Sequence, residues 1–421
     1  MVKTIRSQQE RLQSRLGKRI EIVRVLVRDF EKERGVDIDR KLLTTNFEDV
    51  LKSDVDLVVE VMGGVEPAYD YVRALIEKGC HVVTANKELL AKRGTELVAL
   101  ANRHRVHLQY EASVAGGIPI LGVLRQFLRT NEIISIRGIV NGTTNYILTQ
   151  MEKERQSYGD ALKQAQDLGY AEADPTSDVD GFDAMYKLYI LAQLVFGESL
   201  PLTAIKRKGI ADITAGQIRI AEVLGCRIKL IAQARKTQKG ICLSVEPSAL
   251  FARHPLASIE DADNAVHISG SIVGDLLFTG KGAGELPTAS AVVEDLAYLL
   301  TQPFAPQPAW LEGSVPGSRA AEEEGCSLCC LESSSPSSSP DGFLHFLKHA
   351  GVTIHRLNVQ YDVGGVLRAG LIAEGLREEH AELLARDFGL SVRCFPLLDA
   401  GGEHGGDALS GQKETDLRLL T

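Results

Sequence analysis

Apolar and polar positions along the first hundred residues predict strands and helices in turn. Residues 2–16 have helical spacing with a basic outer face, and Gly17 ends them. Further helices are predicted at Tyr69–Lys78 and Leu89–Arg103, and strands at Ile20–Val27, Leu57–Met62, His81–Thr84 and Val106–Tyr110. Apolar strands separated by helices are typical of a doubly wound parallel sheet, the Rossmann-like α/β class.

The pattern changes after residue 115. Strand-like runs (Ile133–Val140, Ala265–Ser269) mix with helices (Asp160–Leu168, Ala184–Phe196), which indicates an α+β domain over residues 116–284. Residues 285–301 form a predicted helix with a proline near its start, and we expect it to return to the first domain, residues 1–115. The middle domain is the expected catalytic, substrate and dimerisation domain.

The C-terminal part begins with a predicted linker at 302–325, which carries four prolines and an acidic run. Residues 326–398 then follow the order strand, helix, strand, strand, helix, strand, which is the split ferredoxin-like unit. Its predicted elements are Cys326–Leu331, Phe343–His349, Thr353–Gln360, Gly365–Glu374, Arg377–Phe388 and Ser391–Leu397. Residues 399–421 are a predicted disordered tail.

The composition is that of a globular protein, with 44% hydrophobic and 24% charged residues among 421. A net charge of -9 argues against nucleic-acid binding, which needs a basic face. No apolar run approaches the roughly 20 residues that span a bilayer, so we expect no membrane association. Seven scattered cysteines predict reduced thiols and a cytoplasmic location.

Three of these cysteines form the motif C-x-x-C-C at Cys326, Cys329 and Cys330. The motif could bind metal, but the sequence offers no second C-x-x-C to complete a four-ligand zinc site. We therefore favour a strand with small buried thiols.

The densest polar cluster is Gly169–Lys187, in which five acids fall between Glu172 and Asp183. Asp183 and Lys187 stand at i, i+4 and would share one helix face. A substrate with an α-amino group needs carboxylates, for which Glu172 and Asp178 are suited, and oxidation of a hydroxyl needs a proton acceptor, for which Lys187 is suited. The alternative is a helix start whose acids only stabilise the dipole.

Two further clusters follow predicted strands. Val82–Lys87 ends a parallel strand, where ligands bind in such sheets, although Lys87 could equally be a surface charge at a helix start. In Glu111–Pro119 an acid stands beside paired glycines whose carbonyls could converge on a monovalent cation. A plain strand-to-helix turn is the alternative.

Two glycine-containing clusters complete the set. Val140–Asn145 contains Asn-Gly, which usually marks a turn. Gly280–Ser290 leads into a helix start, where backbone N–H groups could contact an anion or cofactor.

Taken together and in this order, the clusters resemble the homoserine dehydrogenase family from about Val2 to about Leu300. The matching segments are Glu60–Gly64, Thr84–Lys87, Glu111–Pro119, Asn141–Tyr146, Gly169–Lys187 and Gly282–Asp295. The resemblance implies NAD(P)-dependent interconversion of L-homoserine and L-aspartate 4-semialdehyde in threonine, methionine and isoleucine biosynthesis. It also implies a homodimer or higher homo-oligomer.

The resemblance also implies roles for single residues. Lys187 and Lys87 would be the lysines at the reacting centre, with Asp183 as the partner of Lys187. Homoserine would be held by Glu172, Asp178, Tyr170, Gly142 and Thr143. The cofactor would contact Arg28, Gly63, Gly64, Thr84, Asn86, Lys87 and Gly284. Sodium or potassium would be held by the Glu111 carboxylate and the carbonyls of Val114, Gly116 and Ile118.

The chain departs from the family pattern at its start, because the family's first strand and G-x-G-x-x-G loop would precede Val2. We therefore expect an N-terminally truncated chain with weakened cofactor affinity. Arg28, after a predicted strand, could accommodate a 2′-phosphate and favours NADP, whereas Asp29 favours NAD. The missing loop leaves a rival open, a catalytically impaired relic or a regulatory amino-acid-binding subunit.

The C-terminal unit resembles the ACT regulatory domain, in a divergent form. Asp341–Leu344 and His349–Ile354 match the ACT helix and second strand, whereas serines replace the usual Pro-Gly loop. An amino-acid effector such as threonine is what this resemblance implies.

Overall fold

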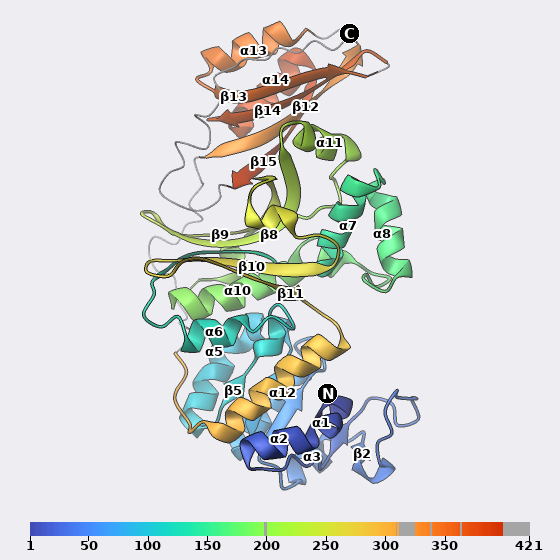
Figure 1. Cartoon of the computed structure of the whole chain (residues 1–421), viewed down its shortest axis with the longest axis vertical. Helices are drawn as coiled ribbons and strands as arrows, with labels where there is room; N and C mark the ends of the chain where they lie inside the picture. Colours follow the sequence, from blue (N-terminus) through green and yellow to red (C-terminus); the bar gives the residue numbers. More distant parts are fainter. Residues whose placement is uncertain (198–199, 309, 311–324, 337–338, 363, 399–421) are drawn as a thin grey trace. The chain divides into compact units, whose positions relative to one another are not determined.

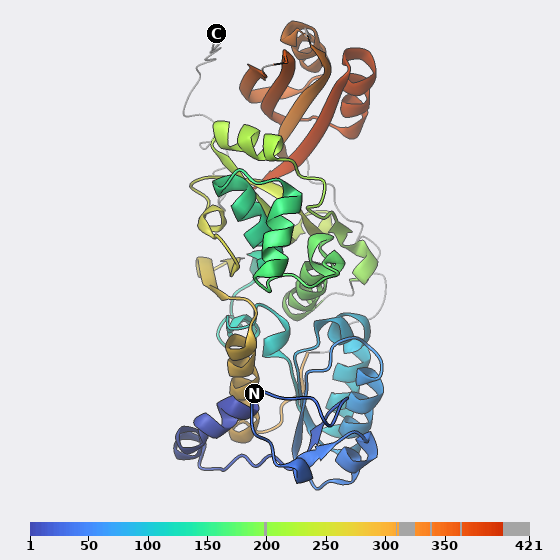
Figure 2. The ribbon, with the colours of Figure 1, turned by 90° about the vertical axis from the view of Figure 1, so that its right-hand side faces the viewer.

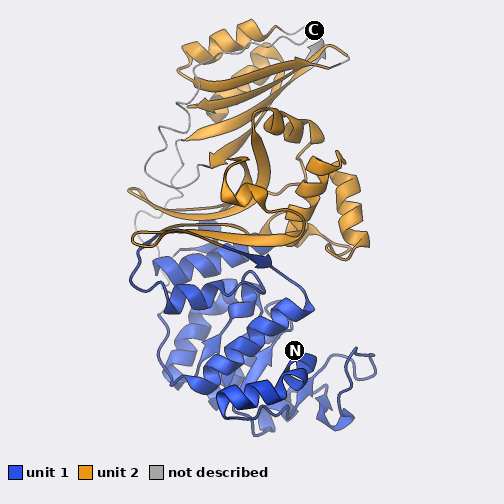
Figure 3. Ribbon diagram, in the orientation of Figure 1, with its two compact units in different colours: residues 1–133, 183–205, 278–318 blue, residues 134–182, 206–277, 319–421 orange. Residues whose placement is uncertain are grey.

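The computed structural model describes residues 1–197, 200–308, 310, 325–336, 339–362 and 364–398. The predicted tail at 399–421 and most of the predicted linker at 302–325 lie outside the described residues. Two compact units are formed, and the chain passes between them several times (Figure 3). Among the described residues, every helix is too short or too polar to cross a bilayer.

Unit 1 comprises residues 1–133, 183–205 and 278–318. Its helices are α1 (Val2–Ser7), α2 (Gln9–Leu16), α3 (Phe47–Lys52), α4 (Ala68–Lys78), α5 (Lys87–His104), α6 (Ile120–Gln126), α10 (Phe182–Phe196, from its second residue) and α12 (Glu285–Thr301). Its strands are β1 (Val25–Leu26), β2 (Leu43–Thr44), β3 (Leu57–Glu60), β4 (His81–Thr84) and β5 (Leu108–Gln109).

Strands β3, β4 and β5 form a parallel sheet in that order, and helices cover both of its faces (Figure 2). On one face, α12 buries Val292, Val293 and Leu296 against Val83 and the N-terminal helices. On the other face lie α4 and α5, whose apolar stripes are buried. The Rossmann-like arrangement predicted from the sequence is confirmed.

The predicted strand Ile20–Val27 is wrong over most of its length, because only Val25 and Leu26 form a ladder, with β2. The side chains of Ile20 and Ile22 instead pack against the cluster that contains α12. Apolar residues can be buried without pairing their backbone, and hydrophobicity alone cannot tell the two cases apart.

Unit 2 comprises residues 134–182, 206–277 and 319–421. Its sheet runs in the order β11-β10-β6-β8-β9-β15-β12-β14-β13, with β7 beside β9 (Figure 1). The strands before residue 300 are β6 (Ile133–Ile139), β7 (Lys206–Arg207), β8 (Cys226–Thr237), β9 (Gly240–Phe251), β10 (Asp263–Gly270) and β11 (Gly274–Lys281). The helices are α7 (Gly142–Lys153), α8 (Tyr158–Asp167), α9 (Thr176–Val179) and α11 (Ala215–Val223).

The last part of unit 2 has the predicted βαββαβ order. Its elements are β12 (Cys326–Pro336), α13 (Pro340–His349), β13 (Thr353–Tyr361), β14 (Val366–Glu374), α14 (Glu378–Phe388) and β15 (Leu390–Leu398). Neighbouring strands within it are antiparallel, and Phe343, Leu347 and Leu384 of the two helices pack on one face. Cys329 and Cys330 are buried in β12, as the strand reading of C-x-x-C-C predicts.

The end of β15 ties this part to the preceding sheet. Leu397 and Leu398 pair in parallel with Ala249 and Leu250 of β9. Leu398 is also buried in a core with Ile139, Ile231 and Leu256. The ferredoxin-like strands are thus a continuation of the large sheet and share a core with it.

Helix α5 offers a test of packing in unit 1. A Cβ added at Gly94 would lie 2.2 Å from the ring of Trp310, which is buried against Tyr110 and Tyr189. We therefore expect Gly94→Ala to destabilise the protein by about 1–3 kcal/mol through overpacking, despite the better helix propensity of alanine. Trp310 is the single tryptophan, so the urea midpoint of its fluorescence reports this change.

The matched control is Gly159→Ala in α8, where a Cβ would meet only Ser157 Oγ at 3.9 Å. This exposed substitution should raise stability by about 0.5–1 kcal/mol, measured by far-ultraviolet circular dichroism. Equal effects of the two substitutions would contradict the packing argument.

Candidate active site

The Asp183 carboxylate in the first turn of α10 contacts two lysines of unit 1. Its Oδ1 lies 2.9 Å from Lys87 Nζ, and its Oδ2 lies 2.7 Å from Lys187 Nζ. The Asp183–Lys187 contact is the one that the i, i+4 spacing predicts. Lys87, in contrast, comes from the first residue of α5, far away in sequence, so the fold brings the three side chains together.

Burial within this group is uneven. The side chains of Asp183 and Lys187 are 6% and 9% exposed, whereas that of Lys87 is 38% exposed. A buried ion pair is stable only when its charges are satisfied, and here one carboxylate faces two ammonium groups. Such a lysine can donate a hydrogen bond to a carbonyl oxygen or exchange a proton with a hydroxyl.

A second network, centred on Glu60 at the end of β3, holds the strand ends beside this group. Its Oε2 accepts from Thr84 Oγ1 at 2.5 Å, and its Oε1 accepts from Met62 N at 2.6 Å. Asn86 Nδ2 donates to Gly64 O at 2.6 Å, and Asn86 Oδ1 accepts from Leu89 N and caps α5. Thr84 and Asn86 are thereby fixed at the carboxyl end of the sheet, where ligands bind in parallel sheets.

The predicted residue set omitted Glu60, although it is only 5% exposed and organises this edge. An acid that closes an apolar parallel strand is the signal that would have identified it. Of the other predicted cofactor residues, Gly63 directly precedes Gly64, Arg28 lies exposed after β1, and Gly284 directly precedes α12.

Glu111 follows β5 and is buried. Its carboxylate accepts from Leu121 N at 2.8 Å and Gly122 N at 2.6 Å, at the start of α6. Burial raises its pKa, and Arg125 opposes that shift. The backbone N–H of Glu111 donates to Asp295 Oδ2 at 2.8 Å. Burial raises the pKa of Asp295 to about 7.

The loop after Glu111 turns sharply. Ala115 and Gly116 both have positive φ, and a Cβ at Gly116 would lie 2.4 Å from Gly282 O, so glycine is required. The predicted site residues also omitted Asp295, although it ends the family-matching segment Gly282–Asp295. Its position on the buried face of α12 is the signal that was available.

Asn141 in unit 2 begins a helix where its Asn-Gly sequence predicts a turn. Its side chain accepts from Thr144 N and caps α7, and its Nδ2 donates to Asp178 Oδ1 at 2.7 Å. Asparagine is among the preferred N-cap residues, so the turn prediction is corrected. A Cβ at Gly142 would lie 2.8 Å from Ala262 O, so this glycine permits a close backbone approach.

The remaining predicted substrate residues also lie in unit 2. Thr143 Oγ1 donates to Tyr170 O at 2.6 Å, and the Tyr170 ring packs against Tyr146. Glu172 is exposed in the following loop, where its backbone oxygen accepts from Gln166 Nε2 at 3.0 Å.

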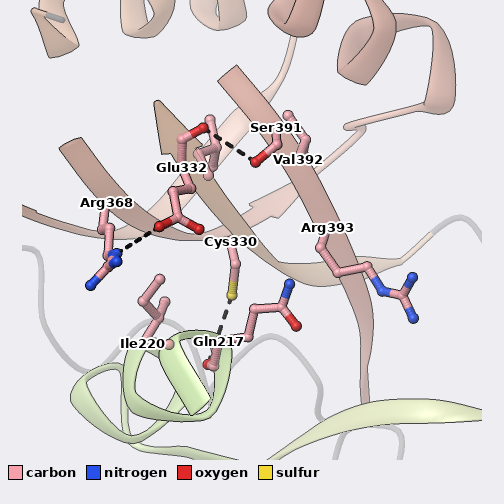
Figure 4. Close-up of a pocket in the computed structure, with 10 residues that line it drawn as sticks. Gln217, Ile220, Cys330, Glu332, Arg368, Ser391, Val392 and Arg393 are labelled. Carbon is pink, nitrogen blue, oxygen red and sulfur yellow. Dashed lines mark hydrogen bonds and ion pairs between the residues drawn. The ribbon is translucent and has the colours of Figure 1, made fainter. Parts of the chain in front are cut away.

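A separate cavity of about 120 Å³ lies between α11 and the ferredoxin-like strands (Figure 4). Glu332 and Arg368 line it and form an ion pair at 2.9 Å. Arg393, also on its wall, pairs with Asp212. The charged groups on the wall are therefore already paired, Glu332 with Arg368 and Arg393 with Asp212.

Comparison with known proteins identifies the relatives of this chain. Residues 1–111 match the family model of the homoserine dehydrogenase NAD-binding domain, and residues 119–297 match that of homoserine dehydrogenase. The Bacillus subtilis homoserine dehydrogenase is 46% identical over 301 residues, which are 71% of this chain and 70% of that protein.

Solved structures of homoserine dehydrogenases are also similar to this chain. A homoserine dehydrogenase from Thiobacillus denitrificans has a TM-score of 0.85 and 35% identity, with 95% of each chain covered. A hyperthermophilic archaeal homoserine dehydrogenase in complex with NADPH has a TM-score of 0.54 and 33% identity, with 62% of this chain and 76% of that chain covered. The chain belongs to the homoserine dehydrogenase family, as the sequence resemblance predicts.

Proposed function

We propose that this chain interconverts L-homoserine and L-aspartate 4-semialdehyde, with Lys187 as the group that exchanges the proton with the substrate oxygen. Members of the family are NAD(P)-dependent oxidoreductases, and the nicotinamide ring supplies or accepts the hydride. The carboxylate shared by Lys87 and Lys187 is the observation that carries the proposal. A catalytically impaired relic would have no reason to keep this arrangement, so we do not favour that rival.

Asp183 keeps Lys187 in place, and Lys87 is the more exposed of the two lysines. We assign Lys87 to the polarisation of the substrate oxygen together with Lys187. Glu172 and Asp178 are assigned to the substrate ammonium group, in line with the family resemblance. Tyr170, Gly142 and Thr143 are assigned to the walls of the homoserine site.

The nucleotide is assigned to the carboxyl end of β3 and β4. Thr84, Asn86 and Gly64 are held there by the Glu60 network, and Gly63 directly precedes Gly64. Gly284 at the start of α12 and Arg28 after β1 complete the proposed set. The preference for NADP, which rests on Arg28, stays a prediction.

A sodium or potassium ion is proposed at Glu111, with the carbonyls of Val114, Gly116 and Ile118. A carboxylate has about four lone-pair sites, so Glu111 can accept two N–H groups and still bind a cation. The tight turn at Ala115 and Gly116 is what would direct carbonyl groups to one point. A cation would also offset the cost of ionising this buried carboxylate.

The homodimer and the amino-acid effector also stay predictions. The cavity lined by Glu332, Arg368 and Arg393 is the place where we would seek the effector.

The first prediction about the proposed function concerns Lys187. Lys187→Ala should lower the kcat of homoserine-dependent NADP or NAD reduction by about 10²–10⁴-fold, because the proton-exchanging group is lost. The control is Lys92→Ala, which removes a surface lysine paired with Glu88 and should leave kcat unchanged. Near-normal kcat in a folded Lys187→Ala protein would refute the assignment.

The second prediction concerns the cation. Replacing a bulky organic cation by sodium or potassium at constant ionic strength should raise the urea midpoint reported by Trp310. The free energy of unfolding should rise by about 2.7 kcal/mol when the cation concentration is a hundredfold above its Kd. Glu111→Gln should abolish this gain, whereas Glu96→Gln on the exposed face of α5 should retain it. The same gain in the Glu111→Gln protein would exclude the site.

The third prediction concerns pH and follows from Asp295. Its pKa is raised from 3.8 to about 7 in the folded protein, so ionisation is costly there. The stability associated with the neutral acid is present below about pH 4 and is lost as the pH rises toward 7. Asp295→Asn keeps an oxygen that accepts from the Glu111 N–H but cannot ionise. The variant should therefore not show the pH-dependent loss in the free energy of unfolding, which is on the order of 4 kcal/mol.

The measurement is the urea midpoint of Trp310 fluorescence between pH 4 and pH 8. Asp70→Asn, an exposed substitution in α4, is the control and should follow the unmodified protein. Parallel curves for the unmodified and Asp295→Asn proteins would show that Asp295 ionises normally.

A further inference from the structure

Three potential metal ligands meet at one end of the ferredoxin-like strands. Cys326 begins β12, Glu374 ends β14, and the two residues stand opposite each other in the ladder. His355 lies on β13, the neighbour of β14 on its other side. One donor atom from each residue lies within 4.8 Å of the other two. The C-x-x-C-C motif thus contributes a single cysteine, Cys326, to a cluster that the sequence motif does not show.

An irregularity in β13 sets the direction of His355. Ile354 pairs with Ala373 and Arg356 pairs with Ile372, so His355 is an extra residue in the ladder, as in a β-bulge. Ile354 packs into the core beneath the helices, whereas Arg356 Nη1 donates to Leu224 O at 3.0 Å. Bulges of this kind re-aim a side chain and often stand beside functional sites.

The ring nitrogen of His355 that faces Glu374 lacks a hydrogen-bond partner among the described residues. This nitrogen, Nε2, is shielded from solvent. The nearest carboxylate oxygen, Glu374 Oε2, is 3.6 Å away. Buried polar atoms without partners are uncommon and call for an explanation, and a bound ion is one such explanation.

We propose that Cys326, His355 and Glu374 bind a divalent transition-metal ion, with Zn²⁺ as the favoured ion. Sulfur, imidazole and carboxylate donors suit Zn²⁺, whereas Mg²⁺ and Ca²⁺ prefer oxygen alone. Zinc–ligand distances of about 2.0–2.3 Å require donors within about 4 Å of one another, so modest side-chain rotation would complete the site. Three protein ligands leave a fourth position for water.

Bound metal would connect the start of β12 to β13 and β14. Since these ligands come together only in the folded sheet, the ion stabilises that sheet by mass action. The site uses none of the residues assigned to catalysis, so it does not depend on the proposed function.

A pair of histidines in α13 must be distinguished from this site. His345 and His349 lie one turn apart on the exposed face of α13, with ring centroids 4.2 Å apart, and such a pair can also bind a metal. It contains no thiolate. A spectroscopic signal that reports sulfur ligation therefore distinguishes the two sites.

The experiment is titration of the full chain with Co²⁺ under reducing conditions, followed by the near-ultraviolet thiolate-to-cobalt charge-transfer absorption. We expect the absorption to saturate and to be displaced by Zn²⁺. Cys326→Ser should abolish it, and His355→Gln and Glu374→Gln should each weaken binding at least tenfold. Cys394→Ser and the double substitution His345→Gln/His349→Gln should leave it unchanged.

A second measurement needs no variant. Zn²⁺ should protect Cys326, which is half-buried, from alkylation in the unmodified protein, as read by mass spectrometry of its peptide. The proposal is overturned if the unmodified chain shows no thiolate absorption, if the absorption persists in Cys326→Ser, or if Zn²⁺ leaves the alkylation rate of Cys326 unchanged.

Discussion

Two lysines of unit 1 share one buried carboxylate, that of Asp183. The arrangement of the elements around the proposed site depends on this interaction. Burying a charge is costly unless it is paired and hydrogen-bonded, and here the Asp183 carboxylate contacts the ammonium groups of both Lys87 and Lys187. The first residue of α5 and the first turn of α10 must therefore lie next to each other. Loss of Asp183 would remove the carboxylate that Lys87 and the buried Lys187 share.

The position of Lys87 depends in turn on the edge of the parallel sheet. Asn86 caps α5 and is held by the carbonyl of Gly64, while Glu60 bonds Thr84 at the end of the neighbouring strand. Each of these bonds fixes the backbone from which Lys87 projects. The Glu60 network therefore positions Lys87 and also shapes the proposed nucleotide edge. Glu60 is tolerated there at 5% exposure because its carboxylate accepts hydrogen bonds from Thr84 and Met62.

Local patterns predicted those features whose cause is local. The limits of β4 were predicted from a short apolar run after Gly79, and those of α12 from a helical pattern with a proline near its start. The contact of Asp183 with Lys187 follows from helical spacing. The family resemblance supplied the proposed roles of residues that are distant in sequence. The prediction of a strand over Ile20–Val27 was wrong because backbone pairing depends on a partner strand, which the hydrophobicity of the segment does not report.

The features that were missed have causes that arise only in three dimensions. Asp295 becomes significant because α12 carries it against the backbone of Glu111. His355 becomes a potential ligand because one unpaired residue in β13 changes the direction of its side chain. The sequence places Asp295 on the apolar face of a helix but does not show what it contacts, and a single histidine in a strand does not differ, in sequence, from the many that have no special role.

The C-terminal strands cannot be regarded as a loosely attached module. Leu398 closes β15 and is buried among Ile139, Ile231 and Leu250, so a shift of β15 along its axis would open a core of the preceding sheet. Opening a packed core costs several kcal/mol, because the cavity is not refilled. A ligand that prefers one position of the ferredoxin-like strands therefore acts directly on the strands β8 and β9, through packing that the chain already contains.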